Sequence, residues 1–406
     1  MKIEELSYAI NPGSHCDLFG AVMVAAGIES LKILVIGTEE CTYYSKNFIF
    51  EYGKKQRDDS LLMLSLTDKE IVLGIEEILV KTIDEIINIY LPEVILIITT
   101  CIVELTGEDI EGIIKSIENK YKTKILLMRT EHFKCDNYIK GMAKTINILG
   151  ELIESPNFEN NLKSFNILGM RYRNGEKSKI SLILKEKGIS INSIVPYSIN
   201  SLDDIKNLSN VKINIVVDFT GLELAKYMER KFSIPYINLL RIGKVEELEK
   251  EYLKIENILE IDIKDNIKEA LNKILNLKNK IKEKNMNNKL AVVAPISVSA
   301  VEIGILLEQV GIIPKIMVIK DIYSFEEEDA EYLSKNYLVK YIKSGNLEPI
   351  RELYKEMDVD YFIGMEYPQI LKKYEIKHLN INYLTDGQFG LEAQEEILSA
   401  ILKECE

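Results

Sequence analysis

Several residue types are scarce or absent in this 406-residue chain, and each shortage excludes a class of function. The chain has no Trp, three His and five Cys, and 51 Lys and Arg residues stand against 64 Asp and Glu residues. The net charge of -13 argues against a general binder of nucleic-acid backbones or membrane surfaces, because both need clustered positive charge. An odd and sparse set of cysteines argues against a disulfide framework and leaves free thiols or metal ligands.

Signals for membranes, secretion and ATP hydrolysis are missing as well. No apolar run approaches the ~18 residues that a membrane-spanning helix needs. The opening MKIEELSYAI carries acidic residues where a signal peptide has a basic flank and an apolar core, so we expect a cytoplasmic protein. The chain also lacks a Gly-x-x-x-x-Gly-Lys-Ser/Thr loop, and we do not expect it to hydrolyse ATP by itself.

Short β-branched segments alternate with amphipathic ones along the whole chain, which is typical of parallel α/β units. The alternation forms three blocks, 1–158, 159–285 and 286–406, with polar stretches near 155–163 and 275–289 between them. We predict an α/β protein with one domain per block. The expected strands are 32–37, 94–100, 124–130, 166–170, 191–195, 213–219, 236–240, 290–295, 315–320, 338–343, 361–364 and 378–384, and the expected helices include 17–26, 68–90, 109–121, 222–232 and 391–404.

Three of the five cysteines lie where expected strands end or expected helices begin. Cys101 directly follows one strand, Cys41 comes four residues after another, and Cys16 stands at the head of a helix. Ligands of parallel α/β sheets bind beyond the carboxyl ends of the strands, where helix N-termini favour the thiolate that binds metal. The three are therefore candidate metal ligands as a set, although their gaps are far longer than those of zinc or ferredoxin loops.

Ordinary packing is the alternative for each thiol, because free cysteine is among the most buried residue types. Placement alone leaves the metal site and the packed thiols both open. We expect Cys135 to be an ordinary packed thiol and Cys405, one residue from the end, to be exposed.

The sequence around the three cysteines resembles, in order and spacing, the N-terminal region of the nitrogenase component 1 family. That family has a first Cys before a helix of small residues, a second in a Gly-x-x-x-Cys turn, and a third in Thr-Thr-Cys before a Gly-Asp/Glu-Asp-Ile/Leu helix start. This chain has Cys16 before DLFGAVMVAAG, Cys41 in GTEEC and Cys101 in TTC, followed by GEDI at 107–110. The intervening TDKEIVLG at 67–74 resembles the family's Thr-Glu-Lys-Asp-Val-Val-Phe-Gly.

The resemblance continues more weakly through 131–141, 221–237 and 386–398, so it covers essentially the whole chain. It implies three Rossmann-like α/β domains with mainly parallel sheets, in agreement with the three blocks. It also implies an oxidoreductase subunit that receives electrons from a separate iron-protein-like ATPase reductase.

For the cysteines, the resemblance implies an iron-sulfur cluster at a subunit interface. Cys16, Cys41 and Cys101 would hold a [4Fe-4S] cluster, or a related cluster, in a homodimer or in a heterodimer with a second component 1-like chain. A cubane has four iron corners, so one corner is left for the partner protomer, another residue type or a solvent species. His15 is adjacent and either contacts the cluster or is an ordinary side chain at the helix entry.

Catalytic nitrogenase subunits hold their molybdenum-iron cofactor through a Cys of the second domain and a His of the third. The chain departs from the family at both positions. The corresponding stretch here, 214–228, has no Cys, and Asp218 is its nearest polar residue. His378 enters an expected strand and does not match the family's His motif. We therefore do not expect dinitrogen reduction. The departure fits a nitrogenase-like subunit that delivers electrons to an organic substrate such as a tetrapyrrole, or a non-catalytic subunit of a heterodimer.

Other interpretations stay open from the sequence alone. The same cysteines would serve a scaffold that carries or matures a metallocluster without turnover, and a metal-free solute- or tetrapyrrole-binding protein would simply pack them. Asp218, Thr220 and Gly221 either line a substrate cavity or belong to a helix start capped by Thr220. Ser297 is expected to cap a helix.

Overall fold

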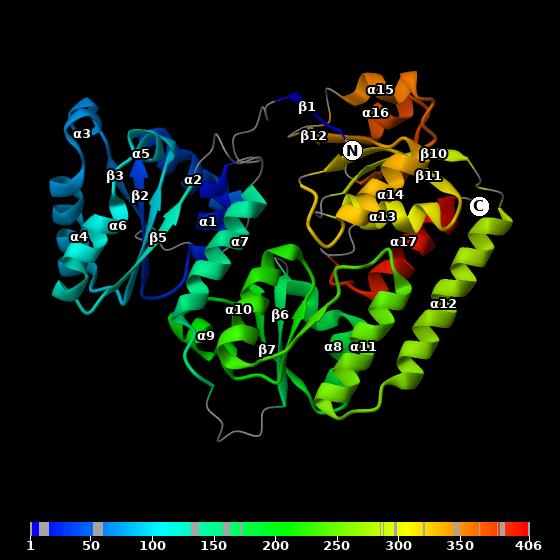
Figure 1. The fold of residues 1–406 in the computed structure, drawn as a ribbon, viewed down its shortest axis with the longest axis horizontal. Helices are drawn as coiled ribbons and strands as arrows, with labels where there is room; N and C mark the ends of the chain where they lie inside the picture. The colour runs from blue at the N-terminus through cyan, green and yellow to red at the C-terminus, as the bar shows by residue number, and fades with distance from the viewer. Residues whose placement is uncertain are drawn as a thin grey trace. The chain divides into compact units, whose positions relative to one another are not determined.

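The computed structural model describes residues 2–7, 16–51, 60–130, 138–156, 163–170, 173–284, 286, 288–295, 299–319, 321–344, 347, 350–364, 366–379, 381 and 386–404 (Figure 1). These residues form three sheets, and the paired strands in each sheet run parallel. The expected α/β class with mainly parallel sheets is confirmed.

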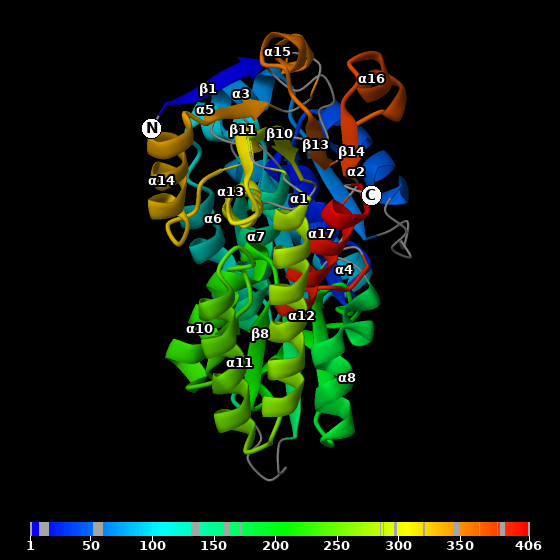
Figure 2. The ribbon, with the colours of Figure 1, turned by 90° about the vertical axis from the view of Figure 1, so that its right-hand side faces the viewer.

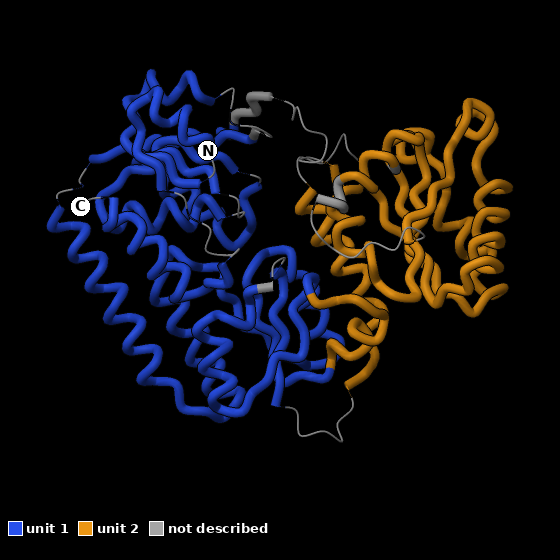
Figure 3. Tube along the Cα trace, turned by 180° about the vertical axis from the view of Figure 1, so that it is seen from behind, with its two compact units in different colours: residues 1–10, 157–197, 210–406 blue, residues 11–156, 198–209 orange. Residues whose placement is uncertain are grey.

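Contacts between residues divide the chain into two compact units (Figure 3). We call Asn11–Pro156 with Ser198–Ser209 the cysteine unit, because it carries the three candidate ligands. We call Met1–Ile10, Asn157–Tyr197 and Asn210–Glu406 the two-sheet unit. Within the described ranges, no helix is both long enough and apolar enough to cross a membrane.

The cysteine unit has one sheet with the strand order β3-β2-β4-β5. All six residues of the central strand β4 are buried, as expected for a parallel sheet with helices on both faces. The strands are β2 (Leu31–Gly37), β3 (Leu61–Ser65), β4 (Val94–Thr99) and β5 (Lys124–Arg129). The helices are α1 (Asp17–Ala25), α2 (Glu39–Glu51), α3 (Asp68–Leu73), α4 (Glu76–Tyr90), α5 (Cys101–Thr106), α6 (Ile110–Ile117), α7 (Tyr138–Leu149) and α9 (Leu202–Lys206).

Three differences between this unit and the sequence prediction have local causes, and α2, α5, α7 and α9 are not among the predicted helices. The helix expected over 68–90 is two helices, because Gly74 ends α3 with a φ of 92°. The helix expected over 109–121 is shorter, since α6 ends at Ile117 and a 3-10 turn follows. The strand β3 is missed because its sequence LLMLS has no β-branched residue.

The two-sheet unit has a four-stranded sheet, β7-β6-β8-β9, and a six-stranded sheet, β1-β12-β11-β10-β13-β14. The first contains β6 (Ser164–Met170), β7 (Ser190–Pro196), β8 (Ile213–Val216) and β9 (Tyr236–Asn238), with α8 (Lys179–Glu186), α10 (Leu222–Phe232), α11 (Val245–Leu259) and α12 (Lys264–Glu283). The second contains β1 (Ile3–Ser7), β10 (Lys289–Ala294), β11 (Ile312–Ile319), β12 (Lys340–Ser344), β13 (Tyr361–Gly364) and β14 (Lys377–Leu379), with α13 (Ala300–Glu308), α14 (Glu327–Tyr337), α15 (Arg351–Glu356), α16 (Pro368–Lys373) and α17 (Leu391–Glu404).

One apolar core joins the two sheets of this unit. The same buried cluster runs from β6 and α8 through α12 to α13 and α17, and Figure 2 shows α12 beside α17. The stretch expected as a solvated helix end and linker is therefore largely helix, with Ile281 fully buried. The domain boundaries 1–158, 159–285 and 286–406 stay a prediction. The strand β1, near the start of the first predicted domain, pairs with β12 of the last one.

Candidate metal centre

Cys41 and Cys101 follow neighbouring strands at the same edge of the sheet. β2 pairs with β4 up to Ile36 and Thr99, α2 carries Cys41 in its first turn, and α5 begins at Cys101. Parallel strands end at the same edge, so both thiols lie at the carboxyl edge, where ligands of such sheets bind. The backbone N–H groups of the helix starts also point there and stabilise negative charge.

Thr100 joins the two strand ends. Its backbone N–H and its Oγ1 donate to the carbonyl oxygen of Ile36, at 3.1 and 2.9 Å. A side chain at Gly37 would overlap that of Thr100, so glycine lets the two turns approach closely. The Gly and Thr positions of the two motifs therefore set how far Cys41 stands from Cys101.

Cys16 reaches the site from a helix. It is the N-cap of α1, with extended backbone angles of φ -100° and ψ 125°. The helix is almost wholly buried and packs against α7 and α2. The position of this thiol therefore depends on helix packing.

The three thiols influence one another electrostatically. The pKa of Cys16 is raised to about 12, chiefly by burial and to a smaller extent by Cys101 and Cys41, while the Leu18 backbone N–H lowers it. Coulombic effects fall with distance, so this coupling is consistent with the predicted grouping of the three cysteines. All three are half-buried and form no disulfide.

The chemistry of this donor set suits an iron-sulfur cluster, because cysteine thiolates are the usual ligands of such clusters. In the part of the chain that the structure describes, no three His, Cys, Asp or Glu side chains are grouped to hold one metal ion. Thiolates of an iron-sulfur cluster bind different irons and stand further apart than ligands of one ion. Three half-buried cysteines at three helix starts suit that arrangement. Cys16, Cys41 and Cys101 stay the predicted ligands.

A polar cluster beside Cys101 is missed by the sequence analysis. Thr99 Oγ1 donates to the Glu104 carboxylate, and Arg129 Nη1 lies 3.2 Å from both oxygens of that carboxylate. Glu104 is in α5 with only 6% of its side chain exposed, and Arg129 ends β5. This pair ties the helix that starts at Cys101 to the next strand. An arginine that follows four apolar residues in the strand KILLMR was the available signal.

The second-domain residues belong to the two-sheet unit. Asp218 is the N-cap of the 3-10 turn Phe219–Gly221, and its Oδ1 accepts from the Thr220 N–H at 3.0 Å and from Thr220 Oγ1 at 2.7 Å. Of the two alternatives for this stretch, the one in which Thr220 is the cap is wrong, because Asp218 is the cap and the threonine donates to it. Asp218 is 2% exposed, and its Oδ2 has no hydrogen-bond partner among the described residues.

His378 lies in β14 and is half-buried. Its Nε2 is 2.8 Å from the carbonyl oxygen of Gly364, and its ring packs edge-on against Phe362. This is a strand histidine with a structural contact. Four further residues singled out from the sequence lie outside the described residues: His15, Cys135, Ser297 and Cys405.

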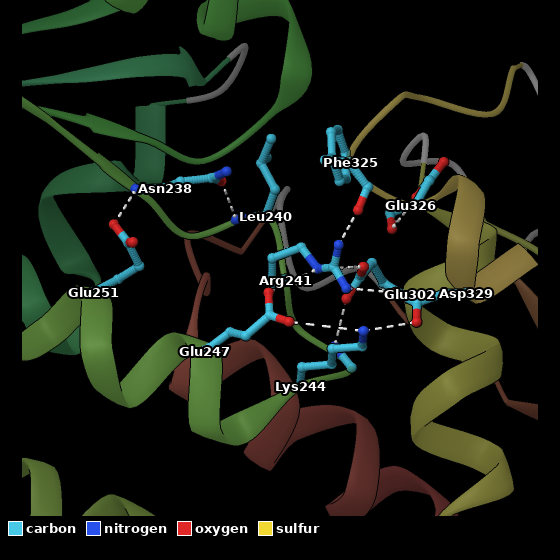
Figure 4. Close-up of polar contacts among 12 residues, drawn as sticks. Asn238, Leu240, Arg241, Lys244, Glu247, Glu251, Glu302, Phe325, Glu326 and Asp329 are labelled. Carbon is cyan, nitrogen blue, oxygen red and sulfur yellow. Dashed lines mark hydrogen bonds and ion pairs between the residues drawn. The ribbon is translucent and has the colours of Figure 1, made fainter.

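A buried ion-pair network joins the sheets of the two-sheet unit, and Figure 4 shows it. Arg241, shortly after β9, lies 3.0 Å from Glu302 of α13 and also contacts Asp329 of α14 and the Phe325 carbonyl oxygen. Lys244 lies 2.7 Å from Asp329. The signal for this network was Glu302, a carboxylate inside the apolar stretch AVEIGILL.

Two carboxylates in or beside this network have raised pKa values. Burial raises the pKa of Glu302 to about 7, although Arg241 and the Gly243 N–H oppose the rise. Burial likewise raises the pKa of Glu326 to about 8, with Glu302 contributing and Tyr323 and Ser299 opposing. The network therefore gains or loses protons near neutral pH.

Comparison with known proteins bears on both units. Residues 16–390 match the family model described as nitrogenase component 1 type oxidoreductase. The chain is 31% identical over 247 residues to the nitrogenase iron-molybdenum cofactor biosynthesis protein NifE of Clostridium pasteurianum, covering 60% of this chain and 53% of that protein. It is 26% identical over 254 residues to a subunit of the light-independent protochlorophyllide reductase of Stigeoclonium helveticum, covering 59% and 49%.

A similar match, 26% identical over 242 residues, links the chain to the nitrogenase molybdenum-iron protein alpha chain of Methanosarcina barkeri, covering 56% and 44%. The chain thus spans about half the length of the curated relatives it matches. Among solved structures, nitrogenase Cp1 at pH 6.5 aligns with a TM-score of 0.72 at 17% identity, covering 100% of this chain and 95% of that one. This likeness concerns the fold and agrees with the expected Rossmann-like architecture.

Proposed function

The chain belongs to the nitrogenase component 1 type oxidoreductases, and from this premise we propose that it is a component 1-like subunit. It passes electrons from an ATP-dependent iron-protein partner, through an interfacial iron-sulfur cluster, to a substrate that the sequence does not identify. The observation that carries the proposal is the placement of Cys16, Cys41 and Cys101 at three helix starts of one unit. Because the partner uses ATP, we propose that both work in the cytoplasm.

Neighbouring groups of the chain surround two of the predicted ligands with hydrogen-bond donors. Thr38 Oγ1 lies 3.7 Å from Cys41 Sγ and donates toward it, and such hydrogen bonds to ligand sulfur help to set a cluster's reduction potential. Cys101 stands at the N-terminus of α5, where the backbone N–H groups of a helix favour negative charge.

The donor set also supports an assembly of two protomers. Three cysteines leave one corner of a cubane [4Fe-4S] cluster without a protein ligand from this set. A second copy of the chain or a second component 1-like chain would complete or cover the cluster. We propose a dimer for this reason, with an iron-protein-like reductase as the transient partner.

We propose an organic substrate rather than dinitrogen. The stretch that corresponds to the nitrogenase cofactor thiolate carries the buried Asp218, which accepts through one oxygen from Thr220 and caps the turn that follows. His378 contacts the Gly364 carbonyl oxygen in a strand. Relatives include a subunit of light-independent protochlorophyllide reductase, which favours a tetrapyrrole-like substrate.

The direct test is anaerobic purification followed by iron and sulfide analysis and electron paramagnetic resonance of the reduced protein. We expect iron and sulfide in the wild-type protein, and their loss in Cys41→Ser and Cys101→Ser. Cys405→Ser is the matched control and should retain both. A wild-type protein that stays free of iron after anaerobic reconstitution would rule the proposal out.

A second candidate function is assembly of a metallocluster without turnover. It is favoured by the 31% identity to NifE, a cofactor biosynthesis protein. The same cysteines would then hold a cluster during its assembly or transfer. The two functions differ in their behaviour with a reductase. Reductase- and ATP-dependent conversion of an organic substrate supports the oxidoreductase, whereas transfer of a cluster to an apo-acceptor without such conversion supports the scaffold.

A further inference from the structure

We propose that two features position Cys16 and adjust the charge around the cluster. The first is the crossing of α1 and α7 at Gly20 and Gly141, and the second is the ion pair between Asp17 and Lys144. These four residues would act through Cys16, as positioning residues. The inference rests on the proposed function for the identity of the cluster. The positioning itself is a property of the metal-free chain and is tested as such.

The two helices touch backbone to backbone at this crossing. A methyl group on Gly20 would overlap the carbonyl oxygen of Tyr138, and one on Gly141 would overlap the carbonyl oxygen of Asp17. Glycine at both positions therefore lets the helices approach more closely than any side chain allows. Asp17 directly follows Cys16, so the contact at Gly141 lies one residue from the ligand.

The helix α7 is in turn fixed to the sheet. Thr145 Oγ1 lies 2.8 Å from the Gly141 carbonyl oxygen and 2.8 Å from Met128 Sδ. Met128 belongs to β5, the neighbour of the β4 strand that leads to Cys101. The path from the sheet to Cys16 therefore runs through α7 and the crossing, whereas Cys41 and Cys101 follow strands directly.

The ion pair adds a charge to this arrangement. The Asp17 side chain is 1% exposed, and its Oδ2 accepts from Lys144 Nζ at 2.6 Å. A buried carboxylate that lost this partner would leave negative charge beside Cys16. Negative charge near an iron-sulfur cluster opposes the uptake of an electron. Lys144 therefore both holds α1 on α7 and offsets the charge of Asp17.

The first experiment measures positioning in the metal-free protein. A short bismaleimide joins Cys16 to Cys41, and mass spectrometry gives the fraction of cross-linked Cys16 relative to singly modified Cys16. We expect Gly141→Ala to lower this ratio several-fold, because α1 must move away from α7. Asn147→Ala, on the exposed side of α7, is the matched control and should behave like the wild type. An unchanged ratio in a folded Gly141→Ala protein overturns the positioning role.

The second experiment leaves the backbone unchanged, so it holds even where Gly141→Ala does not fold. In the reconstituted protein, Lys144→Gln should make the midpoint potential of the cluster more negative, and Lys144→Arg should restore the wild-type value. Equal potentials in all three proteins overturn the charge role. A wild-type protein that binds no iron but shows the cross-linking difference would reject the proposed function while supporting the positioning of Cys16.

Discussion

At the scale of single residues, the three candidate ligands are prepared in different ways. Cys16 is held as a neutral thiol by burial, and its pKa of about 12 means that metal must displace its proton. Cys41 receives a hydrogen bond from Thr38, and Cys101 starts a helix. Their neighbours were only partly predictable, because the Gly37 and Thr100 positions stand in recognisable motifs, whereas the partnership of Glu104 with a strand residue depends on tertiary contacts.

Removal of metal should expose these thiols to alkylation. In iron-loaded protein, we expect iodoacetamide to modify Cys41 and Cys101 slowly, since a thiolate bound to iron is a poor nucleophile. Chelation of the iron should make both reactive, and Cys16 should lag behind them because of its raised pKa. Mass spectrometry of digests before and after chelation measures this, with Cys405 as the internal reference. Equal modification in both states would contradict metal binding at these residues.

Loss of the Thr100 hydroxyl should weaken the junction of the two strand ends. Thr100→Ala removes the donor at 2.9 Å from the Ile36 carbonyl oxygen, and we expect it to lower the free energy of unfolding by about 1 kcal/mol. Thr100→Ser retains a hydroxyl and should lose less. Urea denaturation measures both variants. A Thr100→Ser protein that is no more stable than Thr100→Ala would show that the lost methyl group, and not the hydrogen bond, matters.

At the scale of helices and strands, the sequence pattern predicts most of the strands and several of the helices, and some of the exceptions have local causes. The helix expected over 222–232 matches α10, and the one over 391–404 matches α17, because both carry a regular apolar face. The β3 strand is not predicted because its apolar residues are leucine and methionine, which favour helices at least as much as strands. The break between α3 and α4 depends on the backbone angle of Gly74, which periodicity does not report.

Gly74 should resist substitution for that reason. Its φ of 92° and ψ of 160° lie in a region that side chains rarely adopt, although no atom crowds the position. We expect Gly74→Ala to destabilise the chain by about 1–3 kcal/mol through backbone strain alone. Val72→Ala, at a side chain that is 78% exposed, is the control and should change stability little. Denaturation midpoints that agree for both variants and the wild type would contradict this.

At the scale of the whole molecule, the features that the sequence does not predict are contacts between segments far apart in the chain. The pairing of β1 with β12 joins the N-terminal segment to the last predicted domain, and the Arg241 network joins elements that are far apart in the chain. Neither leaves a local pattern, because strand partners and ion pairs are chosen by the fold as a whole. The sequence predicts three blocks, and it does not predict that the second and third share one apolar core.

The Arg241 network should make stability depend on pH. A carboxylate whose pKa is raised by folding stabilises the native state below its unfolded pKa of 4.5 and loses that contribution as the pH rises through its folded pKa, about 7 for Glu302 and about 8 for Glu326. We therefore expect the unfolding free energy contributed by these groups to fall between about pH 5 and pH 8.

Glu302→Gln separates this effect from other titrations. The amide keeps an oxygen for the Gly243 N–H, which lies 2.8 Å from the Glu302 carboxylate, but it does not ionise. We expect the variant to lose stability less steeply over the same pH range in urea denaturation series. Glu269→Gln, at an exposed carboxylate whose pKa is lowered by Lys273, serves as the control and should keep the wild-type slope. Identical slopes for Glu302→Gln and the wild type would contradict the assignment.

The distribution of the chain between the two units limits how a fragment can be cut. Ser198–Ser209 completes the cysteine unit, where Glu29 N–H donates to Asn200 O at 2.7 Å and Lys206 lies 2.9 Å from Glu93. A recombinant piece that simply spans the first 158 residues would therefore lack this segment and would carry β1 without the strand it pairs with. An unpaired strand edge promotes self-association. Aggregation of that truncated protein would therefore say nothing about the iron chemistry of the intact chain.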